Sequence, residues 1–133
     1  MSIHTILLIQ IVMPKVTRAS AITLRVSEMG RSMRFYRDLL GLRVRYGGDE
    51  AYFSSLILDG FFLNLELSKK PETAWGRIIF YCDDVGEMYS YLKANGYHPD
   101  EPKDAPWGER FFHLKDPDGH ELSFAEPMND MPE

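Results

Sequence analysis

The residues with the clearest capacity for chemistry lie between Asp104 and Phe124, in the stretch DAPWGERFFHLKDPDGHELSF. Two histidines, His113 and His120, stand there among five carboxylates. Histidine and carboxylate side chains brought close together can ligate a divalent metal or transfer protons. The stretch therefore predicts either the metal-binding hairpin of an enzyme or the wall of a groove that only holds a ligand.

A tight turn is predicted in the middle of this stretch, at DPDG (116–119), because Pro117 fixes φ and Gly119 accepts a positive φ. That turn is sufficient reason for both of its aspartates. His120, next to the turn, is interpreted as a solvated turn residue.

Alternation sorts the side chains of the two strands that flank the turn. Phe111, His113 and Lys115 share one phase, and Glu121, Ser123 and Ala125 share one phase on the last strand, with His120 on the opposite face. His113 is interpreted as a hydrogen-bonding wall of a pocket, with a plain structural histidine as the alternative.

Length and composition predict one domain with its own hydrophobic core, since the chain has 133 residues and is 44% hydrophobic. A net charge of −5 argues against a nucleic-acid partner, which requires a concentrated basic face. The single Cys82 excludes an intramolecular disulfide and a multi-cysteine zinc site, and it fits a reducing, cytoplasmic location.

Residues 1–17 are predicted to be an N-terminal arm or extension. Their apolar run ILLIQIVM (6–13) is too short to span a membrane, and no Lys or Arg precedes it as in a signal peptide. The run is either an extra strand or arm that packs on this subunit or a neighbouring one, or an extension upstream of a start at Met13. Residues 18–133 form the predicted domain.

The domain divides into two similar modules, at about 18–70 and 76–127. In each, an alternating strand precedes a helix with apolar residues at helical spacing, and further strands follow. The segments VSEMGRSMRFYRDLLGL and CDDVGEMYSYLKANGY align with one gap, which indicates a pseudo-twofold. One face of each predicted sheet is apolar to cover a helix, and the other is mixed and polar-rich. Two such sheets would enclose a cavity between their polar faces.

Two segments carry a family resemblance, LRVSEMGRSMRFYRDLLGL in the first module and PWGERFFHLKDPDGHELSF in the second. Together they resemble the vicinal oxygen chelate superfamily of glyoxalase I, fosfomycin-resistance enzymes, extradiol dioxygenases and bleomycin-resistance proteins. The resemblance covers about residues 22–127. It implies an α+β fold of two βαβββ modules that form an open, U-shaped mixed sheet around a central pocket, with the helices outside.

The resemblance also implies four metal-ligand positions, which enzymes of the superfamily fill with His, Glu, His or Gln, and Glu. Carried over by motif, these positions hold Ala21, Glu66, Arg77 and Ser123. Alanine offers no lone pair, arginine is a cation without an acceptor, and serine is a poor ligand, so only Glu66 suits a metal. No metal or other cofactor is therefore expected. In its place we expect an ion pair between Glu66 and Arg77.

A displaced metal site made of Glu66, His113 and Glu121 is the alternative, because two carboxylates and one histidine suit several divalent metals. With such a site the chain would be a glyoxalase-like lyase or isomerase, or a dioxygenase. A third hypothesis is an enzyme without metal, with His113 or Glu66 as general base beside Arg77. A fourth is a regulatory module that kept the fold alone.

The stretch PWGERFFHLKDPDGH is most similar to the bleomycin-resistance proteins, which bind a drug unaltered and work as dimers with grooves between subunits. By this resemblance the first hypothesis is a homodimer that sequesters a small molecule, such as an antibiotic or another aromatic or cationic compound. Aromatic residues would supply stacking and polar ones orientation. The predicted ligand-binding residues are Glu66, Arg77, Tyr81, Trp107, Phe111, His113, Glu121 and Ser123.

Overall fold

The computed structural model describes residues 13–128, and its first module forms a four-stranded sheet, sheet A, in the order β1-β4-β3-β2. The strands are β1 (Ala21–Val26), β2 (Arg43–Tyr46), β3 (Phe53–Leu58) and β4 (Phe61–Leu67). β1 runs parallel to β4, and the other pairs are antiparallel. A helical segment joins β1 to β2. It begins as α2 (Met29–Met33) and continues as the π-helix η1 (Arg34–Leu39).

The second module repeats this order in sheet B, β5-β8-β7-β6. Its strands are β5 (Arg77–Tyr81), β6 (Lys103–Asp104), β7 (Glu109–Lys115) and β8 (Glu121–Pro127), with β5 parallel to β8. Helix α3 (Val85–Ala94) follows β5, and Asp84 caps it by accepting a hydrogen bond from the backbone N–H of Glu87 at 2.8 Å. The α+β class and the two βαβββ modules predicted from the sequence are confirmed.

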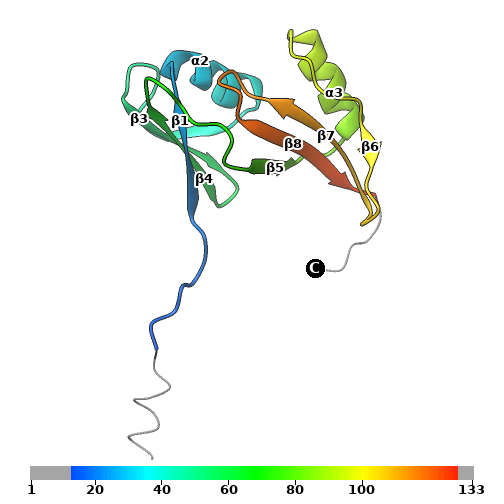
Figure 1. Ribbon diagram of the computed structural model, residues 1–133, viewed down its shortest axis with the longest axis horizontal. Helices are drawn as coiled ribbons and strands as arrows, with labels where there is room; N and C mark the ends of the chain where they lie inside the picture. The colour runs from blue at the N-terminus through cyan, green and yellow to red at the C-terminus, as the bar shows by residue number, and fades with distance from the viewer. Residues whose placement is uncertain (1–12, 129–133) are drawn as a thin grey trace, which may run out of the picture.

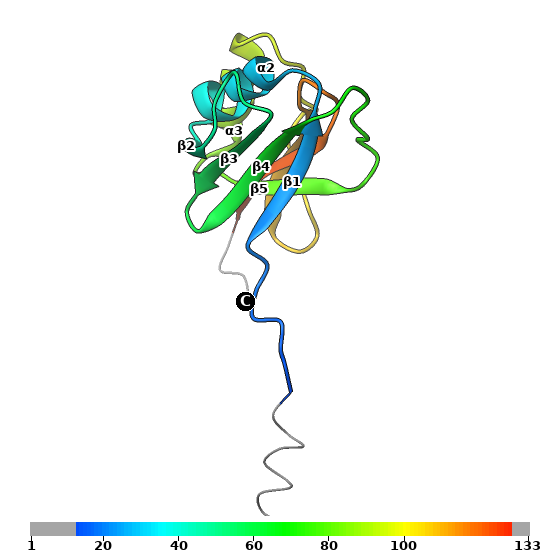
Figure 2. The same cartoon turned by 90° about the vertical axis from the view of Figure 1, so that its left-hand side faces the viewer.

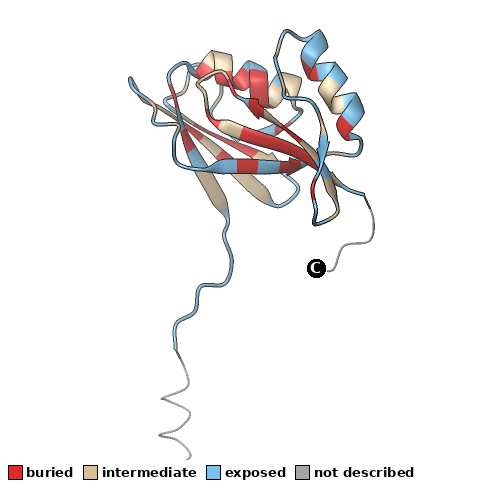
Figure 3. Ribbon diagram, turned by 45° about the vertical axis from the view of Figure 1, so that its right-hand side comes forward, coloured by how far each residue is buried: buried red, intermediate tan, exposed pale blue. Residues whose placement is uncertain are grey.

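Both helical segments lie on the same side of the two sheets (Figure 1). Figure 2 shows sheet A with its strands in succession and α2 at one end of it. One face of each sheet therefore supplies the core, and the buried side chains alternate along β1, β4 and β5, as Figure 3 shows by colour. The periodicity of 2 read from the sequence is thus confirmed in these strands.

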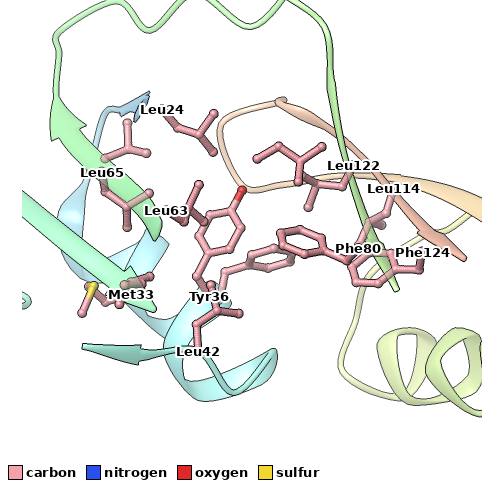
Figure 4. Close-up of a cluster of buried hydrophobic side chains, with 14 of the residues drawn as sticks. Leu24, Met33, Tyr36, Leu42, Leu63, Leu65, Phe80, Leu114, Leu122 and Phe124 are labelled. Atoms are coloured by element: carbon pink, nitrogen blue, oxygen red, sulfur yellow. The ribbon is translucent and has the colours of Figure 1, made fainter. Parts of the chain in front are cut away.

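The core is continuous between the modules. Tyr36 of η1 is fully buried, and side chains from both sheets surround it, among them Leu63 and Leu122 (Figure 4). Its hydroxyl donates to Oδ2 of Asp116 at 2.7 Å. Burial, followed by the negative charge of Asp116, raises the pKa of Tyr36 well above the ordinary tyrosine value.

The DPDG turn connects the modules as well as reversing the chain. Asp118 Oδ1 accepts hydrogen bonds from the backbone N–H of Ser27 at 3.1 Å, from the Ser27 hydroxyl at 2.6 Å and from Arg31 Nη2 at 2.9 Å. Its side chain is only 3% exposed. The turn of module two thus holds the start of α2 in module one. The sequence predicted the turn but not this contact, which joins residues 91 positions apart.

Two strands were not predicted individually from the sequence, β2 and the two-residue β6. Both are edge strands, and every residue in them is exposed, so neither has the alternating burial pattern that would identify a strand. The predicted N-terminal arm lies mostly outside the described residues. Within residues 13–128, no helix is both long and apolar enough to cross a membrane.

Candidate functional site

The candidate site is formed by the sheet faces turned away from the helices, here called the open faces. On sheet A the strand registers give the open face Ala21, Thr23, Arg25, Arg43, Arg45, Phe53, Ser55, Ile57, Phe62, Asn64 and Glu66. On sheet B they give Arg77, Ile79, Tyr81, Lys103, Glu109, Phe111, His113, Lys115, Glu121, Ser123 and Ala125. All eight residues predicted to bind a ligand lie on these faces or, for Trp107, stack against one of them.

The register between β1 and β4 changes one of the positions carried over from the superfamily. On sheet B, Ser123 lies two residues beyond Glu121, the partner of Arg77. On sheet A, the partner of Ala21 is Phe62, so the place equivalent to Ser123 belongs to Asn64. Glu66 lies two residues further on, about 7 Å along the strand.

The residues at the symmetry-related positions are therefore Ala21, Asn64, Arg77 and Ser123. This set of side chains does not fit the superfamily's divalent metal. Of these, only the Asn64 side-chain carbonyl is an oxygen that such ions readily accept. Among residues 13–128, no three His, Cys, Asp or Glu side chains are grouped so that they could hold a metal ion. The displaced site of Glu66, His113 and Glu121 is therefore not assembled within the described part of one chain.

The prediction of an ion pair between Glu66 and Arg77 is wrong. Glu66 pairs with Arg25, its neighbour across the β1–β4 ladder, at 3.5 Å between Oε2 and Nε. Arg77 faces Glu121 instead, at 3.7 Å between Nη2 and Oε1. Each carboxylate thus finds its partner on the adjacent parallel strand, in the same module. Both pairs are partly exposed, so each contributes little to the free energy of folding.

His113 lies at the centre of the polar part of sheet B. Its Nδ1 is 2.7 Å from Ser123 Oγ, and its Nε2 is 3.4 Å from Arg77 Nη1. Since arginine only donates, Nε2 must accept, and the proton of the neutral ring therefore sits on Nδ1 and is donated to Ser123. Burial and then the charge of Arg77 lower the pKa of His113, so the neutral form is favoured.

This tautomer determines what the group can do. His113 offers a basic nitrogen that faces the Arg77 guanidinium, which suits the binding of a polar group or the removal of a proton next to a fixed cation. It does not activate Ser123 as a nucleophile, because the Nδ1–H donates to the serine oxygen instead of taking its proton. The role of His113 as a hydrogen-bonding wall of a pocket stays a prediction.

Aromatic side chains continue the open face of sheet B beyond His113. The Phe111 ring is 5.2 Å from the His113 ring, and Trp107 stacks on Phe111 with centroids 6.3 Å apart and planes at 19°. Trp107 is 61% exposed, and its Nε1 donates to Glu109 Oε1 at 2.6 Å. A hydrogen bond to Glu109 raises the pKa of Tyr81 on the same face. Three exposed or half-exposed rings are therefore available for stacking.

His120 is not the solvated turn residue expected from the sequence. It is 1% exposed, its Nδ1 accepts from Trp75 Nε1 at 2.8 Å, and its Nε2 donates to the Arg25 carbonyl at 2.7 Å. It fastens the segment before β5 and the last strand to β1. The rings of Trp75 and His120 line a small cavity of about 360 Å³, and Glu66 also contributes to its wall.

A larger cavity, of about 450 Å³, opens at the end of sheet B where β7 extends beyond β6. Arg77, His113, Lys115 and Glu121 contribute to one wall, and the loop after α3 forms the other. The polar residues of the open face are therefore accessible from a concave site. Ile79 and Tyr81, 63% and 65% exposed, show that the two open faces do not cover each other within one chain.

Solved structures with the same fold support this architecture. A glyoxalase/bleomycin resistance protein/dioxygenase from Nocardioides superposes with a TM-score of 0.73 at 17% identity, over 99% of this chain and 98% of its own. Lactoylglutathione lyase from Agrobacterium tumefaciens gives a TM-score of 0.71 at 18% identity, with 85% and 96% covered. A superfamily member from Sphaerobacter thermophilus gives 0.69 at 23%, with 84% and 98% covered. At these identities the similarity establishes the fold alone.

A sequence comparison with curated proteins gave no match. The family model described as the Glyoxalase/Bleomycin resistance protein/Dioxygenase superfamily matches residues 18–124, which span the first module and the second module as far as Phe124 in β8. This match agrees with the duplicated βαβββ order observed in the two sheets. The chain belongs to the Glyoxalase/Bleomycin resistance protein/Dioxygenase superfamily.

Proposed function

We propose that this chain is a small-molecule-binding protein that captures its ligand on the open faces without a bound metal. The observation that carries the proposal is the donor set at the superfamily's ligand positions, where Ala21 and Arg77 replace two metal-binding side chains. Arg77 adds a permanent positive charge at the point where a cation would have to bind. The accessible rings of Trp107, Phe111 and Tyr81 also support the proposal, because they offer a surface for a flat apolar group.

The proposed working form is a homodimer. Ile79, Tyr81 and Trp107 leave a large part of their apolar surface in water on one face. A second copy that covered the open face would remove this surface from water and convert a shallow face into a groove with two walls. Sequestration, in which the ligand is held and released unchanged, needs no more than such a groove.

A second candidate function, proton transfer without metal, is favoured by one contact. The acceptor nitrogen of His113 faces Arg77 at 3.4 Å, so a base and a cation that could stabilise a developing negative charge are adjacent. Turnover of a carbon acid at a rate that falls on protonation of His113 would support it. Ligand recovered unchanged after prolonged incubation with stoichiometric protein supports sequestration instead.

The experiment that tests the proposal begins with protein purified without an affinity tag and assayed for metal. Mn²⁺, Fe²⁺, Ni²⁺ and Zn²⁺ are then titrated while the melting temperature is followed, in parallel with a panel of aromatic small molecules. A ligand of the native state raises the melting temperature with concentration. We expect no stoichiometric metal and a shift with aromatic compounds. One equivalent of metal, lost on mutation of Glu66 or His113, would refute sequestration.

The dimer has its own test, gel filtration of the full chain and of a form that starts at Met13. A dimer in both forms places the interface on the described domain. A dimer of the full chain alone places it on the N-terminal arm, and two monomeric profiles refute the dimer.

A further inference from the structure

The open faces carry a charge of the opposite sign to the chain as a whole. The chain has a net charge of −5. The cationic side chains of the two open faces are Arg25, Arg43, Arg45, Arg77, Lys103 and Lys115. The carboxylates of the same faces are Glu66, Glu109 and Glu121. The ligand expected from the sequence was an aromatic or cationic compound, and this local excess of positive charge argues against a cationic one.

The three carboxylates are also already engaged. Glu66 pairs with Arg25 at 3.5 Å, and Glu121 faces Arg77 at 3.7 Å. Glu109 accepts a hydrogen bond from the Trp107 indole at 2.6 Å. A cationic ligand would have to displace one of these partners to reach a carboxylate, which reduces the net gain in binding free energy.

Arg45, in contrast, is held in place with most of its donors unused. Its guanidinium carbon lies 4.0 Å from the centroid of the Phe62 ring, and its Nε donates to Ser55 Oγ at 3.3 Å. Among the described residues, no side chain or carbonyl accepts from its two terminal nitrogens. A guanidinium fixed by stacking on one strand and by a hydrogen bond to another presents its remaining fork at little further entropic cost.

The neighbours of Arg45 suit an organic acid. Phe53 and Ile57 lie on the same face of β3, half-buried, and provide an apolar surface beside the cation. Asn64, between them on β4, has its side-chain oxygen buried without a hydrogen-bond partner, while its amide nitrogen donates to Thr23. The face thus combines a pre-oriented cation, an apolar floor and an unsatisfied polar group.

We propose that the ligand of this protein is an anion, a carboxylate or phosphate attached to an aromatic or other apolar group, and that Arg45 is the anchor for its acidic head. The inference rests on the proposed binding function and specifies its ligand class. Bidentate hydrogen bonding from the Arg45 fork to two oxygens fixes the head, and the apolar part lies on Phe53 and Ile57. Arg43, two residues before Arg45, adds to the attraction over a longer range.

The test uses full-length protein and three probes with the same ring and different heads: 2-naphthoic acid, 2-naphthalenemethanol and 2-naphthylmethylamine. Dissociation constants are measured by isothermal titration at low and at 0.5 M salt. The acid is expected to bind at least tenfold more tightly than the amine at low salt, with the difference reduced by salt. 2-Naphthyl phosphate is expected to follow the acid.

Matched variants locate the effect. Arg45→Gln is expected to weaken binding of the acid at least tenfold and binding of the alcohol less than twofold. Arg45→Lys keeps the charge but loses the fork, so an intermediate loss is expected. Arg34→Gln removes the same charge from an exposed position of η1 on the helical side. It should change the dissociation constants of the acid and of the alcohol by less than twofold. Unchanged melting temperatures check that the Arg45 variants fold.

The outcomes separate this inference from the function on which it rests. An amine or alcohol that binds as tightly as the acid, or an acid whose affinity does not respond to Arg45, overturns the anionic ligand class while the binding function stands. If none of the four probes binds, both are overturned.

Discussion

The contact between the DPDG turn and the start of α2 makes a quantitative prediction about stability. Asp118 accepts three hydrogen bonds of 2.6–3.1 Å from Ser27 and Arg31 through one almost fully buried carboxylate oxygen. A hydrogen bond to a charged group is worth about 1.5–3 kcal/mol, but Ser27 is exposed and can be rehydrated. Arg31, 36% exposed, also recovers part of its solvation. We therefore expect Asp118→Ala to lower the free energy of unfolding by about 3 kcal/mol.

Urea denaturation followed by circular dichroism measures this loss as a fall in the transition midpoint. Asp83→Ala is the matched control, because it removes an exposed carboxylate from the turn before α3 and should cost less than about 0.5 kcal/mol. A double-mutant cycle of Asp118→Ala with Arg31→Ala should give a coupling free energy of about 1 kcal/mol or more. A loss below about 1 kcal/mol for Asp118→Ala, or no coupling with Arg31, would refute the conclusion that this turn holds the two modules together.

Three further predictions follow from the buried and perturbed groups. The pKa of His113 is lowered by burial and by Arg77, so its neutral form stabilises the fold fully above the ordinary histidine pKa of about 6.5. This contribution is lost as the pH falls through the lower folded pKa, so His113→Gln should flatten the profile of stability against pH on the acid side of about pH 6.5. Tyr36→Phe removes the hydrogen bond to Asp116 and should cost about 1–2 kcal/mol in urea denaturation, whereas no loss would show that water replaces the hydroxyl. Burial raises the pKa of Cys82 to about 11, so iodoacetamide should alkylate the native thiol at pH 8 at least tenfold more slowly than the urea-unfolded one.

Most of the fold was readable from the sequence because its signals are local. The alternation of Leu24 and Val26, the apolar stripe with Met33 and Tyr36, and the cap at Asp84 each depend on near neighbours along the chain. The sequence also placed the predicted ligand-binding side chains on the correct phase of their strands. Phase has a period of 2 and requires no knowledge of which strand lies alongside.

The pairs within the site were not readable, because they depend on register. Glu66 meets Arg25 since β1 and β4 are parallel and in a register that no short motif specifies. The same register gives Asn64, not Glu66, the place equivalent to Ser123. Carrying positions over by motif preserved the face of the sheet but missed the level along the strand.

His120 shows a second limit. Its position beside a turn indicated exposure to solvent. In the structure each ring nitrogen forms a hydrogen bond, one with Trp75 and one with the Arg25 carbonyl, and both partners are distant in sequence. The partners of a histidine decide whether its burial is tolerated, and here both come from other segments.

The most direct test of metal-independent binding on the open faces is chemical-shift mapping of a bound aromatic ligand on EDTA-treated, isotope-labelled protein. We expect saturable shifts confined to the open faces, and the same dissociation constant before and after removal of metal. Binding that disappears with EDTA and returns with a divalent ion, or shifts confined to the helical side, would contradict a metal-independent binding site on the open faces.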